Sequence, residues 1–142
     1  MTASQGFAAA WDQLVLAIRR LQARGQQSPE DLTLAQYYVV RGLQREGPMA
    51  LCALAELAGV AAPTATRFVD GLERAGVVRR ERSREDRRTV VISLTATGQE
   101  RLKRKERQLA RRRRLLYERL DPAERAQSER LLRHLAELIG EL

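Results

Sequence analysis

The sequence predicts a mainly α-helical chain with one small β-hairpin. Through most of the 142 residues, apolar side chains recur every three or four positions, which places them on one face of a helix. Over residues 77–94 this pattern gives way to two runs rich in β-branched residues on either side of a charged stretch. Glycine and proline lie between the periodic segments, where helices end and turns form. The whole chain, 1–142, is predicted to form a single winged-helix chain, as the elements taken in order indicate.

The first periodic segment covers residues 5–25 and predicts an amphipathic helix. Its apolar stripe includes Trp11, Leu14 and Ile18, with polar residues between them. Residues 26–29 form a short predicted linker to the next helix.

Three shorter helices are predicted next. Thr33 is a suitable N-cap for the first of them, and Gly47-Pro48 ends it. The second covers residues 51–58 and is followed by Gly59, which can adopt the left-handed backbone of a tight turn. The third starts around Pro63, since proline is tolerated in the first turn of a helix. Two short helices around a glycine form a helix-turn-helix pattern.

The segment after this pattern predicts a β-hairpin. Residues 77–82 and 89–94 are the expected strands, and the charged residues 83–88 are the tip. A hairpin directly after a helix-turn-helix is a wing, so residues 33–98 are predicted to be a winged helix-turn-helix lobe that binds DNA.

Two further helices are predicted in residues 99–142. Thr95 or Thr97 is the expected cap of a long helix from Gly98 onward, and Asp121-Pro122 separates it from a last helix.

The flanking helices carry apolar stripes that a winged helix does not need for its own core. The commonest partner for such a surplus in a small DNA-binding protein is a second copy of the same chain, so we expect a homodimer. We therefore expect residues 5–25 and 99–142 to be dimerisation helices. The expected interface residues are Trp11, Leu14, Ile18, Leu131, Leu135 and Leu138.

The charge balance points to a polyanionic partner. Lys and Arg outnumber Asp and Glu by 26 to 18, which gives a net charge of +8. Such a field attracts nucleic acid or an acidic membrane face, although a basic surface that is merely solvated would give the same composition.

Several other classes of protein are disfavoured. One cysteine, Cys52, excludes an internal disulfide and a zinc site built on thiolates, and we expect no metal or cofactor. The first ten residues lack the pattern of a signal peptide, and no stretch approaches the roughly 20 apolar residues of a membrane span. We therefore expect a cytoplasmic protein with no membrane partner. One His and one Cys far apart leave nothing to carry catalysis, so we do not expect an enzyme.

An ordered series of motifs over residues 30–100 resembles the MarR (multiple antibiotic resistance regulator) family. The resemblance is specific because the motifs follow one another in the family's order, from the second helix to the exit of the wing. They are Leu32-Thr33, Gln36-Tyr37, Gly47-Pro48-Met49, Leu54-Ala55, Ala58-Gly59-Val60, Pro63-Thr64, Thr66-Arg67, Val69-Asp70, Leu72-Glu73, Gly76-Val77-Val78, Asp86-Arg87-Arg88, Leu94-Thr95 and Gly98.

This resemblance makes the helix from Pro63 a recognition helix for the major groove of DNA. Thr64, Thr66 and Arg67 lie in its first turns, the end that enters the groove. Arg67 can donate two hydrogen bonds to guanine, Thr66 can meet a base edge or a thymine methyl, and Thr64 can hold a phosphate. The alternative for Arg67 is a solvated surface residue.

The resemblance also assigns the wing tip. It implies that Arg88 enters the minor groove and that Asp86 braces the tip by pairing with an arginine. Phosphate contacts or plain solvation are the alternatives for the other arginines of the hairpin, which are Arg79, Arg80, Arg82, Arg84 and Arg87.

Two positions need separate treatment. Ala61 stands where the family usually has a serine cap, and the missing cap typically costs about 0.5–2 kcal/mol. Cys52 is interpreted as a small buried residue at the start of a helix, with a redox role as the alternative, since a helix N-terminus can lower the pKa of a thiol.

The leading hypothesis is a regulator, and more specifically a repressor, that binds a pseudo-palindromic operator as a dimer. The resemblance implies a small effector, aromatic or phenolic, held between the DNA-binding lobe and the dimerisation helices. The arginine-rich face over residues 101–114 offers a place for an anionic effector, support for DNA phosphates, or only a solvated surface. A basic RNA-binding or nucleoid protein without operator specificity is the alternative from another class.

Overall fold

The computed structural model describes residues 2–25 and 28–142, so part of the predicted linker 26–29 lies outside the described residues. The chain divides into two compact units, Met1–Lys105 and Glu106–Leu142, and each is considered by itself. The fold is mainly helical with one two-stranded antiparallel hairpin, which confirms the predicted class. In chain order the elements are α1 (Ala3–Arg24), α2 (Leu34–Glu46), α3 (Leu51–Ala58), α4 (Ala62–Arg74), β1 (Val78–Arg82), β2 (Val90–Leu94), α5 (Ala96–Arg119) and α6 (Pro122–Gly140).

Reciprocal side-chain caps mark where α2 and α6 begin, as Thr2 and Gln5 do for α1. The Thr33 hydroxyl accepts a hydrogen bond from the amide of Gln36 at 3.1 Å, and the Gln36 side chain accepts one from the amide of Thr33 at 3.0 Å. Asp121 and Glu124 form the same reciprocal pair before α6. Each box satisfies two N–H groups that a helix start leaves without partners. The predicted cap at Thr33 and the break at Asp121-Pro122 are therefore confirmed.

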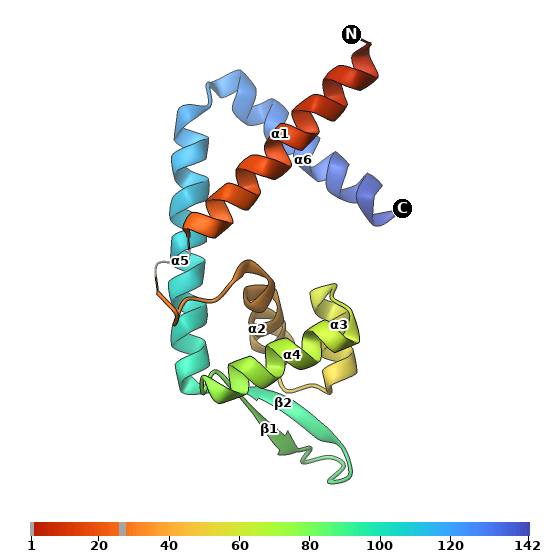
Figure 1. Ribbon diagram of the computed structural model, residues 1–142, viewed down its shortest axis with the longest axis vertical. Helices are drawn as coiled ribbons and strands as arrows, with labels where there is room; N and C mark the ends of the chain where they lie inside the picture. The colour runs from red at the N-terminus through yellow and green to blue at the C-terminus, as the bar shows by residue number, and fades with distance from the viewer. Residues whose placement is uncertain (1, 26–27) are drawn as a thin grey trace. The chain divides into compact units, whose positions relative to one another are not determined.

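The core of the first unit lies among α2, α3, α4 and the hairpin (Figure 1). Apolar side chains of every one of these elements are almost fully withdrawn from solvent, as the helical and strand periodicities require. The buried set is Leu32, Tyr37, Val39, Val40, Leu43, Leu54, Ala55, Ala65, Val69, Leu72, Val77, Val78, Ile92 and Leu102.

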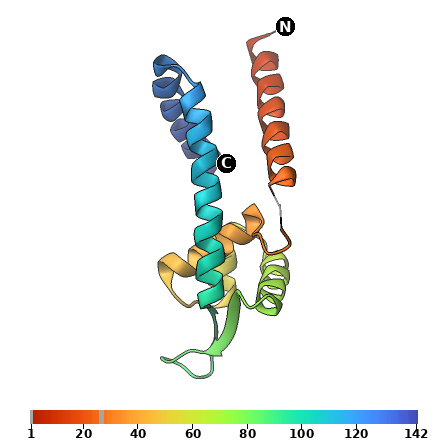
Figure 2. The ribbon, with the colours of Figure 1, turned by 90° about the vertical axis from the view of Figure 1, so that its left-hand side faces the viewer.

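The hairpin is anchored at its base. Arg80 stands opposite Ile92 in the antiparallel register. On its other side Ile92 exchanges two backbone hydrogen bonds with Met49, at 2.8 and 3.2 Å, so the loop between α2 and α3 adds a short third strand. The tip, in contrast, projects beyond the helices of the lobe (Figure 2). No sequence pattern indicates the Met49 pairing, because a single bridge has no periodicity.

The long helix α5 begins against the hairpin. The Thr95 hydroxyl accepts a hydrogen bond from the Gly98 amide at 3.0 Å and donates one to the carbonyl of Val77. Thr95 is thus the cap, and the helix starts at Ala96, two residues earlier than predicted. A Cβ at position 98 would collide with the Val77 carbonyl oxygen, so only glycine fits this crossing.

One ion pair ties the start of α5 to the segment before α2. Asp31 is buried, and its carboxylate lies 2.8 Å from a guanidinium nitrogen of Arg104. The amide of Ser28 donates a further hydrogen bond to the same carboxylate at 3.2 Å. Burying an unpaired carboxylate would cost free energy, so these two partners stabilise Asp31 in its buried position.

The position of Cys52 contradicts the sequence interpretation. Its side chain is exposed, whereas Leu54 and Ala55 of the same short helix are buried. A step of 100° per residue turns Cys52 away from the face that packs on α2 and α4. The prediction of a buried cysteine was wrong because apolar neighbours in sequence are not neighbours on a helix face.

The helices outside the lobe present apolar side chains to solvent. Neither α1 nor α6 buries a single described residue. Among the stripe residues Trp11, Leu14, Ile18, Leu131 and Leu138 are exposed, and Leu135 is half-buried. No helix within the described residues is long and apolar enough to cross a membrane.

Candidate nucleic-acid interface

One face of α4 is open along its whole length. Pro63, Arg67, Asp70 and Arg74 follow one another at helical spacing and are all exposed, while Ala65, Val69 and Leu72 hold the opposite face in the core. Ala61, the N-cap, makes no side-chain hydrogen bond, as the sequence departure predicted. The N-cap side chain therefore accepts no hydrogen bond from the amides in the first turn of α4.

The polar residues of the first turns differ in what they already bind. Thr64 is half-exposed. The Thr66 hydroxyl donates a hydrogen bond to the Ala62 carbonyl at 3.0 Å, so its proton is used and only its oxygen is free to accept. Arg67 is exposed and makes no hydrogen bond or ion pair within the described residues. Arg67 is thus the side chain of this turn that is free to donate to a ligand.

Asp86 organises the wing tip. One of its carboxylate oxygens accepts from the Arg88 amide at 3.0 Å, and the other accepts from the Thr89 hydroxyl at 3.4 Å. Its own carbonyl accepts from the Thr89 amide at 3.0 Å. The expected pairing of Asp86 with an arginine side chain is not observed among the described residues; the brace acts through the backbone instead, because a tight turn brings amides closer than guanidinium groups.

The turn leaves Arg87 and Arg88 with free guanidinium groups. Both are exposed, and neither makes an ion pair in the part of the chain that the structure describes. Arg82 differs, because its guanidinium donates a hydrogen bond to the Arg87 carbonyl at 2.9 Å and so links the end of β1 to the far side of the tip. The tip therefore presents two adjacent cations on a hydrogen-bonded frame.

Arg80 forms ion pairs with α4. Its guanidinium lies 2.5 Å from a carboxylate oxygen of Asp70 and 2.6 Å from one of Glu73, and its amide donates to Glu73 at 3.1 Å. The hydrogen bond to Asp70 is the main cause that raises the pKa of Arg80 above its ordinary value, against the opposing effect of desolvation. The sequence made Arg80 a candidate for a phosphate contact, but two of its guanidinium nitrogens already bond to carboxylates of α4.

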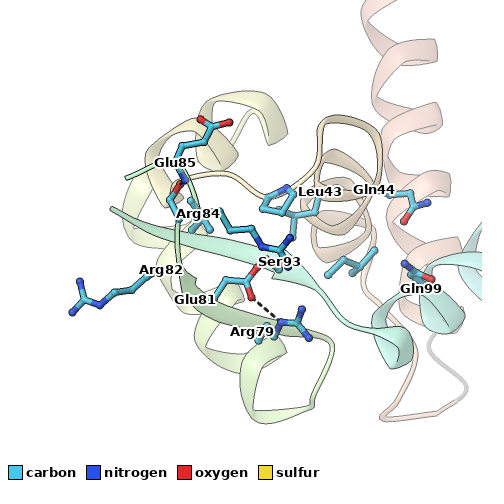
Figure 3. Close-up of a pocket in the computed structure, with 13 residues that line it drawn as sticks. Leu43, Gln44, Arg79, Glu81, Arg82, Arg84, Glu85, Ser93 and Gln99 are labelled. Atoms are coloured by element: carbon cyan, nitrogen blue, oxygen red, sulfur yellow. Dashed lines mark hydrogen bonds and ion pairs between the residues drawn. The ribbon is translucent and has the colours of Figure 1, made fainter. Parts of the chain in front are cut away.

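The opposite face of the hairpin borders a hollow of about 640 Å³ with α2 and the start of α5 (Figure 3). There Arg79 pairs with Glu81 at 3.2 Å, and the buried Ser93 hydroxyl donates a hydrogen bond to the same carboxylate. The Ser93 bond, followed by the charges of Arg79 and Arg84, holds the pKa of Glu81 below its usual value. Arg84 lines the same hollow as Glu81 and is exposed.

Sequence reasoning missed the carboxylates that organise this surface. Asp70 and Glu73 were noted only as parts of a motif, and Ser93 only as one residue of the expected strand 89–94. Their partners lie 7 to 12 residues away across a helix-to-strand turn or a hairpin, a separation that no local pattern marks. Within the described residues, no group of three or more acidic, His or Cys side chains is arranged to hold a metal ion.

Comparison with known proteins identifies this arrangement. A sequence model of the MarR family matches residues 32–90, which contain the helix-turn-helix and most of the wing. The HTH-type transcriptional regulator YhbI of Bacillus subtilis is 31% identical over 114 residues, which are 80% of this chain and 70% of that protein. A second B. subtilis regulator of this type, YfiV, is 37% identical over 65 residues, but the match spans only 41% of its length.

Solved structures share the fold. A MarR family protein from Bacillus stearothermophilus superimposes with a TM-score of 0.76 at 24% identity, over 99% of both chains. BpsR of Bordetella bronchiseptica, whose DNA binding is regulated by 6-hydroxynicotinic acid, superimposes with a TM-score of 0.70 at 24% identity, over 90% of this chain and 98% of that one. The winged helix, the family match and the relatives agree, and they describe regulators rather than enzymes. The chain belongs to the MarR family of DNA-binding transcriptional regulators.

Proposed function

We propose that this regulator is a ligand-responsive repressor that binds a pseudo-palindromic operator as a homodimer. The observation that carries the proposal is the pairing of a free Arg67 on the open face of α4 with free arginines on a braced wing tip. A helix for the major groove and a tip for the neighbouring minor groove are the two contacts that a winged helix makes.

In this proposal α4 reads base edges. Arg67 donates its two parallel N–H groups to O6 and N7 of a guanine, since nothing in the described part of the chain competes for them. Thr66 offers its methyl group and its acceptor oxygen. Thr64, which follows Pro63 at the helix start, meets a phosphate through its hydroxyl group.

The wing reads shape rather than sequence. Arg88 enters a narrow A·T-rich minor groove, where the negative potential is strongest, while Arg84 and Arg87 contact flanking phosphates. Asp86 keeps the backbone at Arg88 in one conformation and so limits the entropy that the wing loses on binding.

The apolar stripes support the homodimer. A helix of 22 residues that buries none of its side chains has little to stabilise it in water beyond its own hydrogen bonds. A second copy would cover the stripes of α1 and α6 and would present two recognition helices to two half-sites about one helical turn apart.

The effector belongs to the proposal as well. BpsR responds to a small aromatic acid, and this chain carries a net charge of +8 that favours anions. We propose a small aromatic or anionic effector that binds the DNA-free state more tightly and releases the operator by population shift in the cytoplasm.

The test is selection of preferred sequences from a random DNA pool, followed by titration of the purified chain on the selected duplex. We expect two inverted half-sites and binding that survives an excess of random competitor DNA at physiological salt. Binding that random DNA abolishes would instead support the nucleoid or RNA-binding alternative.

A further inference from the structure

Arg80 is the most heavily bonded arginine on the DNA-facing side of the lobe among the described residues. Two of its guanidinium nitrogens contact two different carboxylates of α4, Asp70 and Glu73, and its backbone amide donates to Glu73 as well. Its side chain is 31% exposed, less than the 49% of Asp70 and the 40% of Glu73. A planar guanidinium fixed between two acceptors restrains both elements in orientation as well as in distance.

The positions of these carboxylates are unfavourable for DNA binding unless they are neutralised. Asp70 lies on the same open face of α4 as Arg67, three residues further along. A free carboxylate there would repel the phosphates that the helix has to approach. Arg80 neutralises it from β1, the strand that leads to the wing tip.

We propose that Arg80 is a positioning residue, which through Asp70 and Glu73 fixes the wing relative to the recognition helix so that both grooves are contacted together. This inference rests on the proposed function, because it takes α4 and the wing tip as the DNA contacts. Arg80 itself touches no DNA in this scheme. We call the three residues Arg80, Asp70 and Glu73 the wing clamp.

A positioning role of the wing clamp and a purely electrostatic effect of its carboxylates predict opposite changes in DNA affinity when the carboxylates are neutralised. Asp70→Asn and Glu73→Gln keep the shape of the side chains and each make the protein more positive by one charge. If only charge matters, both variants bind DNA more tightly, and an Arg80 that has lost one of its two carboxylates adds a phosphate contact that steepens the slope of log K against log salt by about 0.9. If the wing clamp positions the wing, both variants bind the operator more weakly, by about three- to a hundredfold as for coupled residues in one network, with the slope unchanged.

A double-mutant cycle combines Glu73→Gln with Arg88→Ala and measures operator affinity. The coupling between the two substitutions is not changed by a general loss of stability. In an Arg88→Ala background the wing no longer contributes its minor-groove contact, so its position no longer matters. We expect Glu73→Gln to weaken operator binding in the parent protein and to have little further effect beside Arg88→Ala. Arg80→Lys is expected to restore part of the affinity lost in Arg80→Ala, since an ammonium group can neutralise but cannot bridge the two carboxylates in a plane.

Controls separate failure of the inference from failure of the proposed function. Arg79→Ala removes the same charge from the neighbouring residue, which pairs on the other face of the hairpin, and is expected to have the smaller effect. Thermal unfolding of each variant confirms that the fraction titrated is folded. Tighter binding, or unchanged binding, of Asp70→Asn and Glu73→Gln while Arg67→Ala and Arg88→Ala weaken binding overturns the wing clamp alone. Unchanged binding in Arg67→Ala and Arg88→Ala overturns the proposed interface, and the inference with it.

Discussion

At the scale of single residues, the arginines differ in whether their guanidinium groups already bond to acceptors within the chain. Arg80 and Arg79 are paired with carboxylates of the chain, and Arg82 with a carbonyl, whereas Arg67 and Arg88 are free of such partners among the described residues. A run of like charges in sequence thus divides into arginines that hold the fold and arginines that remain available to a ligand.

The free state of Arg67 leads to a prediction about base reading. Arg67→Ala should cost about 1–3 kcal/mol of discrimination at one base pair in each half-site, because a bidentate contact to guanine is lost. The measurement is a titration against operators with single base-pair changes. Arg74→Ala is the matched control, since it removes an equally exposed arginine from the same face of α4, in its last turn. Equal losses for every sequence would make Arg67 a phosphate contact.

Glycines at two positions give a prediction about stability. Gly98→Ala should lower the free energy of unfolding by about 1–3 kcal/mol or more, because its methyl group would press into the Val77 carbonyl. Gly71→Ala, in α4, meets no atom within 4 Å and should raise the stability by about 0.5–1 kcal/mol, as in other helix interiors. Denaturant unfolding of the two variants measures both. Equal effects would contradict the close crossing at Gly98.

At the scale of elements, the hairpin has two faces with different tasks. The Arg80 face is held on α4, and the face with Arg79, Glu81 and Ser93 borders the hollow toward α2 (Figure 3). Alternation along β1 separates the two sets, since successive side chains point to opposite sides of a strand. The base of the wing is therefore held on α4 by Arg80 and on the loop before α3 by the bridge from Ile92 to Met49, whereas the tip projects away from the helices (Figure 2).

Glu81 gives a prediction about pH. Its folded-state pKa lies below the ordinary 4.5, so its bonds stabilise the hairpin above that pH, and this contribution is lost as the pH falls through the folded value. Ser93→Ala should raise the pKa of Glu81 toward 4.5, since the Ser93 hydroxyl is the largest cause of the shift. Titration of the Glu81 side-chain carboxyl carbon by NMR measures it. Arg79→Ala removes a smaller cause of the lowered pKa and should move the titration midpoint of Glu81 less. A midpoint that Ser93→Ala leaves unchanged would contradict the hydrogen bond from Ser93 to Glu81.

At the scale of the whole molecule, large apolar side chains are exposed along the two flanking helices. They lie in the stripes of α1 and α6, with Leu14 50% and Leu131 55% exposed. Exposed apolar stripes of this kind support the proposed homodimer.

This surface leads to a prediction about assembly. Leu14→Glu and Leu131→Glu should convert the proposed dimer to a monomer at micromolar concentration and lower operator affinity steeply, because one half-site alone would then be bound. Sedimentation velocity and titration measure the two effects. Leu57→Glu is the control, since Leu57 is 51% exposed but lies on α3, outside the stripes. A parent protein that sediments as a monomer and still binds a full operator tightly would contradict the homodimer.

Local patterns predicted most of the fold. The helices, the cap at Thr33, the break at Asp121 and the hairpin follow from periodicity, capping residues and turn residues, all of which act within a few positions along the chain. The candidate base-reading residue Arg67 came from the family resemblance, which implies that the second helix of the helix-turn-helix is the recognition helix, and from its place in the first turns of that helix.

Only the tertiary structure decided which partners those residues take. The exposure of Cys52, the bridge from Met49 to Ile92 and the capture of Arg80 by Asp70 and Glu73 depend on how separate elements pack against each other. A sequence pattern specifies which face of an element is apolar, because that follows from the geometry of one helix or strand. It does not specify which of several similar arginines meets a carboxylate. A hydrogen bond forms only within a narrow range of distance and angle, and the turns between elements decide which two side chains come within that range.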